Sequence, residues 1–287
     1  MVYDVAIIGT GPAGLAAALT LKLHNKEIIW FGSAELSDKV GKSEKIANYP
    51  GVPMVSGADL NAAFAAQAKE MGLEPKEARV TNIADMGGKF MVLADNEMYE
   101  ARALLLATGT ATAKGMEGEA EMLGRGVSYC ATCDGFLYKG KTVAVYCTDE
   151  RMAHDIKYLE EICGKVYIYT NFGYEPAAET SEVLASPLKK LSGAFKCDTA
   201  ELFDGTTLAV DGVFILRPAI APSTVMPGLE MDGAHIMVGR GQETNFKGFY
   251  AAGDCTGRPY QIAKATGEGN VAAHAILEYL SEIEKES

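Results

Sequence analysis

The sequence has 287 residues, with 26 basic and 38 acidic side chains that give a formal net charge of −12. This charge argues against general binding to nucleic acids or anionic membranes, because contact with phosphates requires clustered Lys and Arg. The N-terminal residues enter a strand without a basic region or a long apolar run, and no segment reaches the length of a membrane span. We therefore expect a cytoplasmic protein whose six cysteines are redox, metal-binding or core residues rather than structural disulfides.

A glycine-rich turn follows the first predicted strand, residues 3–8, and precedes an Ala/Leu-rich helix over about 12–24. This order of strand, turn and helix is the context of the dinucleotide fingerprint. Its first glycine permits a tight turn, its second lets the backbone approach a pyrophosphate, and its third lets helix and strand pack closely. The alternative is a turn whose glycines are only structural. We predict a dinucleotide site at Gly9, Gly11, Pro12, Ala13 and Gly14.

The second strand, residues 27–32, lacks the acidic residue that usually ends it and binds a ribose. Glu35 follows a little later, so the ribose contact stays open. Two further apolar strands, 104–109 and 248–254, end in Ala-Thr-Gly and Gly-Asp.

The motifs GTGPAG, LLLATG and FYAAGD, in this order, resemble the FAD-binding domain of two-dinucleotide-domain flavoproteins. The resemblance implies FAD as the cofactor and a bond from Asp254 to its ribityl chain, whereas an ordinary turn residue is the alternative for Asp254. It also implies a helix that begins near Gln261 and Ile262 with its N-terminus toward the flavin. The remaining residues that it places at the cofactor are Asn48, Thr108, Gly109 and Gly253.

Cys130 and Cys133 form a CxxC motif, whose spacing suits either a redox disulfide or a metal. Zinc normally requires two more ligands, but there is no second CxxC, and the four histidines are isolated in the sequence. We therefore predict no metal site.

The stretch YCATCDG closely resembles the active site of low-molecular-weight thioredoxin reductases, and the resemblance covers essentially the whole chain. It implies an α/β fold of two Rossmann-like three-layer domains. An FAD domain, 1–112 and 218–287, is interrupted by a smaller inserted domain of the pyridine-nucleotide type, 113–217, that carries the CxxC. A homodimer is implied as well.

The same resemblance assigns roles to three residues. Cys133 would exchange electrons with the flavin, Cys130 would attack the disulfide of thioredoxin, and Asp134 would donate and accept the proton. The chemistry agrees, because a thiolate is the attacking species and a departing thiolate needs a proton. The alternative for Asp134 is a turn former before Gly135.

The inserted domain repeats the strand, turn and helix without the polar parts of a nucleotide site. A strand at 141–146 precedes Met152, Ile156, Leu159 and Ile162 at helical spacing, and a second strand covers 166–169. The turn reads Cys147-Thr148-Asp149 where the family has glycines, and Thr170-Asn171-Phe172 stands where it has a His-Arg-Arg cluster. At about 5 Å and an effective dielectric of about 20, each like-charge pair between Asp149 and a phosphate costs roughly 3 kcal/mol. We expect Asp149 and Glu150 to cap the helix instead.

The combination of an intact CATC with erased nucleotide motifs is similar to a subfamily that uses reduced ferredoxin in place of NADPH. We therefore expect FAD-dependent reduction of thioredoxin with ferredoxin as donor. The alternatives are a flavin disulfide oxidoreductase with another donor or substrate, and a non-catalytic redox-sensing flavoprotein. Candidates for docking an acidic ferredoxin are Lys39, Lys42 and Lys45, although such a run is more commonly a solvated face.

Overall fold

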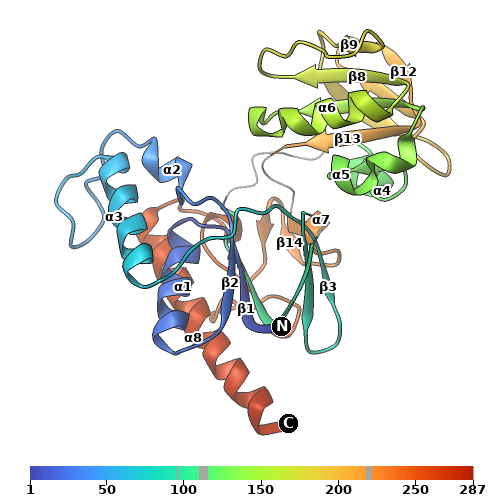
Figure 1. Cartoon of the computed structure of the whole chain (residues 1–287). Coiled ribbons are helices and arrows are strands. Elements are labelled where there is room, and N and C mark those ends of the chain that lie inside the picture. The colour runs from blue at the N-terminus through green and yellow to red at the C-terminus, as the bar shows by residue number, and fades with distance from the viewer. Residues whose placement is uncertain (96, 110–115, 218–221, 287) are drawn as a thin grey trace. The chain divides into compact units, whose positions relative to one another are not determined.

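The computed structural model describes residues 1–95, 97–109, 116–217 and 222–286, without the side chains of Ala120, Cys133 and Glu286. The chain divides into two compact units, Met1–Thr112 with Pro222–Ser287 and Ala113–Ala221. Both are α/β structures that contain parallel strands, as Figure 1 shows. The expected domain boundaries at 112/113 and 217/218 fall at segments 110–115 and 218–221, which lie outside the described residues.

The first unit is built on a sheet of order β2-β1-β5-β4-β3, in which β16 also pairs with β5. One edge of β5 pairs parallel with β1 over residues 100–106, and the other edge pairs antiparallel with β4 over 97–101 and parallel with β16 over 104–106. The elements of this unit are β1 (Val2–Ile8), α1 (Pro12–Leu23), β2 (Ile28–Phe31), α2 (Asp38–Gly41), α3 (Gly57–Glu70), β3 (Val80–Asp85), β4 (Phe90–Ala94), β5 (Glu97–Leu106), α7 (Pro222–Val225), β14 (Met231–Asp232), β15 (His235–Ile236), β16 (Phe249–Ala251), η3 (Asp254–Thr256) and α8 (Ile262–Glu286).

The core of the first unit lies where α1 and α8 pack side by side (Figure 1). The side chains of Ile7, Leu105 and Ile276 are fully buried there, and burying each contributes about 1.5–3 kcal/mol. The two helices can approach closely because residue 269 is a glycine. A Cβ atom there would lie only 2.1 Å from the carbonyl oxygen of Ala13. This packing fixes the start of α1 against α8.

The second unit has a parallel sheet of order β6-β13-β7-β8-β9 and a small antiparallel sheet of order β10-β11-β12. Ile156 and Leu159 of α6 are fully buried, while Met152 and Ile162 pack partly buried against the same core. The predicted helical face is thus confirmed. The elements are α4 (Glu119–Met122), β6 (Val127–Ser128), α5 (Ala131–Asp134), η1 (Gly135–Tyr138), β7 (Thr142–Cys147), η2 (Glu150–Met152), α6 (Ala153–Ile162), β8 (Lys165–Thr170), β9 (Ser181–Val183), β10 (Leu188–Ser192), β11 (Thr199–Leu202), β12 (Thr207–Ala209) and β13 (Gly212–Leu216).

Among the residues that the structure describes, no helix is both long enough and apolar enough to cross a membrane.

Candidate active site

Three strand ends of the first unit meet at one edge of its sheet. Ile8 of β1 pairs with Leu106 of β5, and Leu106 pairs with Ala251 of β16. The ladder continues past these ends, because Ala107 N donates to Ile8 O at 2.7 Å and Ala252 N donates to Leu106 O at 2.9 Å. The loops that follow therefore lie side by side, and they carry five of the predicted cofactor residues: Gly9, Thr108, Gly109, Gly253 and Asp254.

The glycine turn has the geometry that a pyrophosphate requires. Gly9 has φ +114°, and a Cβ at Gly14 would lie 2.0 Å from the carbonyl oxygen of Gly9, so both glycines are needed for the turn itself. Gly11 differs, because a Cβ there would meet nothing within 4 Å. The N-terminus of α1, which begins at Pro12, has no side-chain cap and no acidic residue in its first turn. An anion can therefore approach the N–H groups of this helix start.

We expect the substitution Gly11→Ala to weaken FAD binding on the order of 10-fold or more. The added methyl group would keep the pyrophosphate of FAD away from the backbone N–H groups that hydrogen-bond to it. The free energy of unfolding of the apoprotein should fall by less than about 1 kcal/mol, since φ is −69° and the space is open. The matched variant Gly14→Ala should destabilise the apoprotein instead. Titration of each apoprotein with FAD, beside its denaturant unfolding curve, measures both effects. Unchanged affinity in Gly11→Ala would contradict the placement of the pyrophosphate.

Residues from distant segments of the first unit also come together at this edge. Asn48 Nδ2 donates to Gln261 Oε1 at 2.7 Å, so two of the predicted cofactor residues are in direct contact. The helix α8 begins at Ile262, and Ala265 N donates to Gln261 O at 3.0 Å. The start of α8 thus lies where the sequence placed it.

The predicted basic run lies at the surface, with 62% of the Lys39 side chain and 82% of the Lys42 side chain exposed. Lys39 Nζ donates to Asp254 Oδ2 at 2.5 Å and lies 5.0 Å from the ring centroid of Tyr260. Lys42 Nζ lies 3.9 Å from Asp38 Oδ2. Lys39 therefore belongs to the surroundings of Asp254, a contact across 215 residues that no local pattern predicts.

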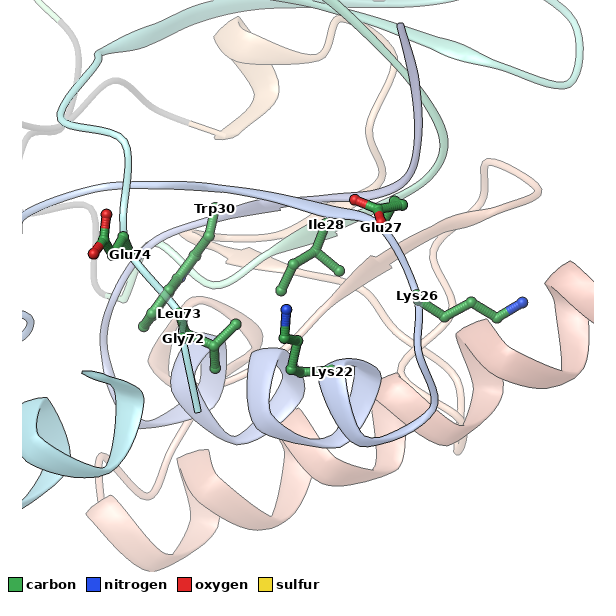
Figure 2. Close-up of a pocket in the computed structure, with 8 residues that line it drawn as sticks. All are labelled: Lys22, Lys26, Glu27, Ile28, Trp30, Gly72, Leu73 and Glu74. Carbon is green, nitrogen blue, oxygen red and sulfur yellow. The ribbon is translucent and has the colours of Figure 1, made fainter. Parts of the chain in front are cut away.

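A hollow of about 210 Å³ lies elsewhere on the first unit. Figure 2 shows Lys22 of α1, Trp30 of β2 and Leu73 among its lining residues. Lys22 is in the last turn of α1, whereas Gly11 caps the first turn. Dinucleotides bind at the carboxyl ends of parallel strands, where the helix begins, so this hollow is not the cofactor site.

The CxxC segment forms one helical turn, α5, and its first cysteine is in a disulfide. Cys130 is disulfide-bonded and partly exposed. Its Sγ lies 3.5 Å from Thr132 Oγ1. A Cβ at Gly135 would lie 2.8 Å from the ring of Tyr158, so this glycine lets the segment pack directly onto α6. Phe136, which follows, leaves 64% of its surface exposed.

Asp134 is held by a buried serine. Ser128 Oγ donates to Asp134 Oδ2 at 2.6 Å and accepts from Cys130 N at 3.1 Å. Burial, and after it the charge of Asp134, raises the pKa of Tyr138. Sequence reasoning did not single out Ser128, although its position two residues before the first cysteine was a usable signal. The Ser128 hydroxyl is therefore hydrogen-bonded to both the Asp134 carboxylate and the backbone of Cys130.

The remaining four cysteines are buried. Burial raises the pKa of Cys163 to about 11 and that of Cys255 to about 12. Cys255 Sγ donates to Ala252 O at 3.2 Å. Cys147 is also fully buried, and its Sγ donates to Asp149 O at 3.3 Å. These surroundings describe core thiols rather than redox groups.

The raised pKa values predict selective alkylation. At pH 8, below both raised values, Cys163 and Cys255 remain protonated thiols, and protonated thiols do not attack iodoacetamide. After reduction of the folded protein, label is expected on the peptide that contains Cys130 and Cys133 and not on the peptides of Cys163 or Cys255. Peptide mass spectrometry measures this. Stoichiometric labelling of Cys255 in folded protein would contradict its assignment as a core thiol.

The turn after β7 is capped by its own side chains, as predicted. Asp149 is the N-cap of η2 and accepts from Arg151 N at 3.1 Å. Arg151 Nη2 donates to Asp149 Oδ2 at 2.8 Å, and Glu150 adds a second acidic residue to the first turn. In the first unit the corresponding helix start, at Gly11 and Pro12, is uncapped and open to an anion, whereas here the Asp149 carboxylate occupies that position.

The polar groups described at the neighbouring strand ends of the second unit are engaged within the chain. Thr170 Oγ1 donates to Phe172 O at 2.5 Å, and Phe172 packs against the core that contains Cys147. Arg217, which follows β13, is buried and ion-paired with Glu119. Of the residues described at this edge, Arg151 and Arg217 therefore both engage carboxylates of this chain.

Residues 3–150 match the family described as pyridine nucleotide-disulphide oxidoreductase. The chain belongs to this family. It is 30% identical to a thioredoxin reductase of Listeria monocytogenes over 99% of this chain and 96% of that protein. To a thioredoxin reductase of Helicobacter pylori it is 32% identical over 96% of this chain and 98% of that protein.

Solved structures extend the comparison. A ferredoxin-flavin thioredoxin reductase from Clostridium acetobutylicum is 40% identical with a TM-score of 0.89, and 99% of each chain is covered. A thioredoxin reductase from Gloeobacter violaceus is 29% identical with a TM-score of 0.77, covering 98% of this chain and 95% of that one. These findings confirm the resemblance and the two-domain Rossmann-type fold. The protein is a flavin disulfide oxidoreductase with FAD as its cofactor.

The described residues fit FAD. The open space at Gly11, the uncapped start of α1 and the convergence of the three loops supply a site for a dinucleotide. By contrast, no group of three or more His, Cys, Asp or Glu in the described part of the chain could hold a metal ion.

Proposed function

We propose that the protein reduces the disulfide of thioredoxin through Cys130 and Cys133, with electrons that reach its FAD from reduced ferredoxin rather than from NADPH. The observation that carries the choice of donor is the Asp149 cap, which puts a carboxylate paired with Arg151 where a pyridine nucleotide needs an open glycine turn. The likeness to the ferredoxin-flavin enzyme of Clostridium acetobutylicum supports the same choice.

The driving force is sufficient for this direction. A ferredoxin near about −400 mV and thioredoxin near about −270 mV differ by roughly 130 mV, or about 6 kcal/mol for two electrons. Bound FAD supplies the conversion between a one-electron donor and a two-electron acceptor.

The protein's own residues carry out the disulfide exchange. The Cys130 thiol gives its proton to Asp134, and the resulting thiolate attacks the thioredoxin disulfide, forming a mixed disulfide and releasing one thioredoxin thiolate, which takes that proton from Asp134. Cys133 then attacks Cys130 and breaks the mixed disulfide, and its thiol proton passes to the second thioredoxin thiolate as that thiolate leaves. The dithiol loses two electrons, thioredoxin gains them, and the enzyme disulfide is restored. Ser128, which contacts both Asp134 and Cys130 N, holds the acid beside the reacting cysteine.

The test is anaerobic turnover with a panel of thioredoxins, in which new thioredoxin thiols are counted with reduced ferredoxin or with NADPH as the reductant. Fast turnover with ferredoxin alone is expected. Reduction of the flavin without thioredoxin turnover would point to another substrate. A change only in partner binding with the state of the CxxC would point to a redox sensor. A homodimer and a cytoplasmic location belong to the same proposal, and both can be checked by light scattering and cell fractionation.

A further inference from the structure

Two side chains of α8 enclose the loop that carries Asp254. Lys264 Nζ donates to Gly253 O at 2.7 Å, to Gly257 O at 2.8 Å and to Thr256 Oγ1 at 3.0 Å. An ammonium group has three N–H donors, and the loop uses all of them. Lys264 thus binds both ends of residues 253–257.

Glu268, one helical turn further along α8, completes the arrangement. Its Oε2 accepts from Gly253 N at 2.9 Å and from Thr256 Oγ1 at 3.0 Å, and it lies 3.0 Å from Lys264 Nζ. The side chains of Lys264 and Glu268 are only 17% and 21% exposed. Hydrogen bonds to charged groups are stronger than neutral ones, and partial burial shields them from water.

The loop needs such support because its backbone is unusual. Gly253 has φ +91° and Gly257 has φ +130°, a region open to glycine and otherwise rarely populated. The loop lies at the strand edge where the cofactor residues converge, and Gly253 faces Ala13 of α1, since a Cβ there would lie 3.0 Å from the Ala13 side chain. A freely moving loop would lose its conformational entropy when the cofactor binds.

We propose that Lys264 and Glu268 are positioning residues for FAD, which preform the loop of residues 253–257 so that Asp254 is in place before the cofactor arrives. This inference rests on the assignment of FAD and on the proposed role of Asp254, and it is independent of the electron donor. The i, i+4 spacing of the two residues was visible in the sequence, but their three loop partners were not.

The experiment measures FAD binding to apoprotein by quenching of flavin fluorescence. We expect Lys264→Met to raise the dissociation constant about 10-fold or more, because each lost bond to a charged donor weakens binding several-fold. Lys264→Arg, which keeps the charge and the donors, should stay within about threefold of the wild type. Lys285→Met removes a lysine from the last turn of the same helix and should have no effect.

Thermal unfolding of each apoprotein shows whether the variants are folded. If Lys264→Met does not fold, Glu268→Gln carries the test, with an expected loss of affinity of about threefold or more. FAD affinity within twofold of the wild type in the folded variants would overturn the proposal. Equal loss in Lys264→Arg and Lys264→Met would overturn it too. Because this titration needs neither ferredoxin nor thioredoxin, its result is separate from a failure of the proposed function.

Discussion

The variant Cys130→Ser is expected to lose thioredoxin reduction by at least about 1,000-fold while retaining its FAD. Serine has nearly the shape of cysteine, but its hydroxyl does not ionise near neutral pH and cannot form the mixed disulfide. The loss should therefore appear in turnover and not in cofactor content. The measurement is the rate of thioredoxin thiol formation, beside the flavin absorbance of the purified variant.

Cys163→Ser is the matched control, since Cys163 is a free, buried cysteine of the same unit outside the CxxC. It should turn over at a rate close to that of the wild type, with some loss of stability because a polar group enters the core. A Cys130→Ser variant that keeps a tenth or more of wild-type turnover would contradict the assigned attacking role.

The variant Asp134→Asn is expected to slow thioredoxin reduction by about 100-fold or more, within the range that general acid–base groups contribute. The amide can still accept the hydrogen bond that Ser128 donates to Asp134 at 2.6 Å, so the local structure should survive. It has no proton to transfer to a departing thiolate.

The measurement is kcat against pH from about 6 to 9 for the wild type, Asp134→Asn and Asp198→Asn. Asp198 is an exposed carboxylate of the same unit, hydrogen-bonded only locally by Thr199 among the contacts described. Its substitution should leave both rate and profile unchanged. An Asp134→Asn variant with the wild-type rate and profile would show that Asp134 is only a turn residue.

The fold could be predicted from the sequence where a short motif also determines the local backbone conformation, such as a strand that ends in a glycine turn. The apolar strands before GTGPAG, ATG and GD are parallel neighbours, so their ends meet as Ile8, Leu106 and Ala251 do. The replacement of glycine by Asp149 could be interpreted in the same way, because a carboxylate at a helix start is a cap by simple electrostatics.

Contacts between side chains far apart in the sequence were not predictable. Arg217 and Glu119 are separated by 98 residues, and neither belongs to a sequence motif from which the other could be predicted as its partner. Lys39 is exposed, as expected of a basic run, but its ion pair with Asp254 had no signal in the sequence. Such pairs depend on how the loops close over one another, which sequence periodicity does not encode.

The central claim concerns the donor, and one measurement tests it most directly. The oxidised, FAD-loaded protein is mixed anaerobically with NADPH, NADH or reduced ferredoxin, and the flavin absorbance is followed. Reduced ferredoxin should bleach the flavin, whereas both nicotinamide nucleotides should leave it oxidised, because Asp149 and Arg151 occupy the turn that they need. Rapid, stoichiometric bleaching by NADPH or NADH would contradict the account.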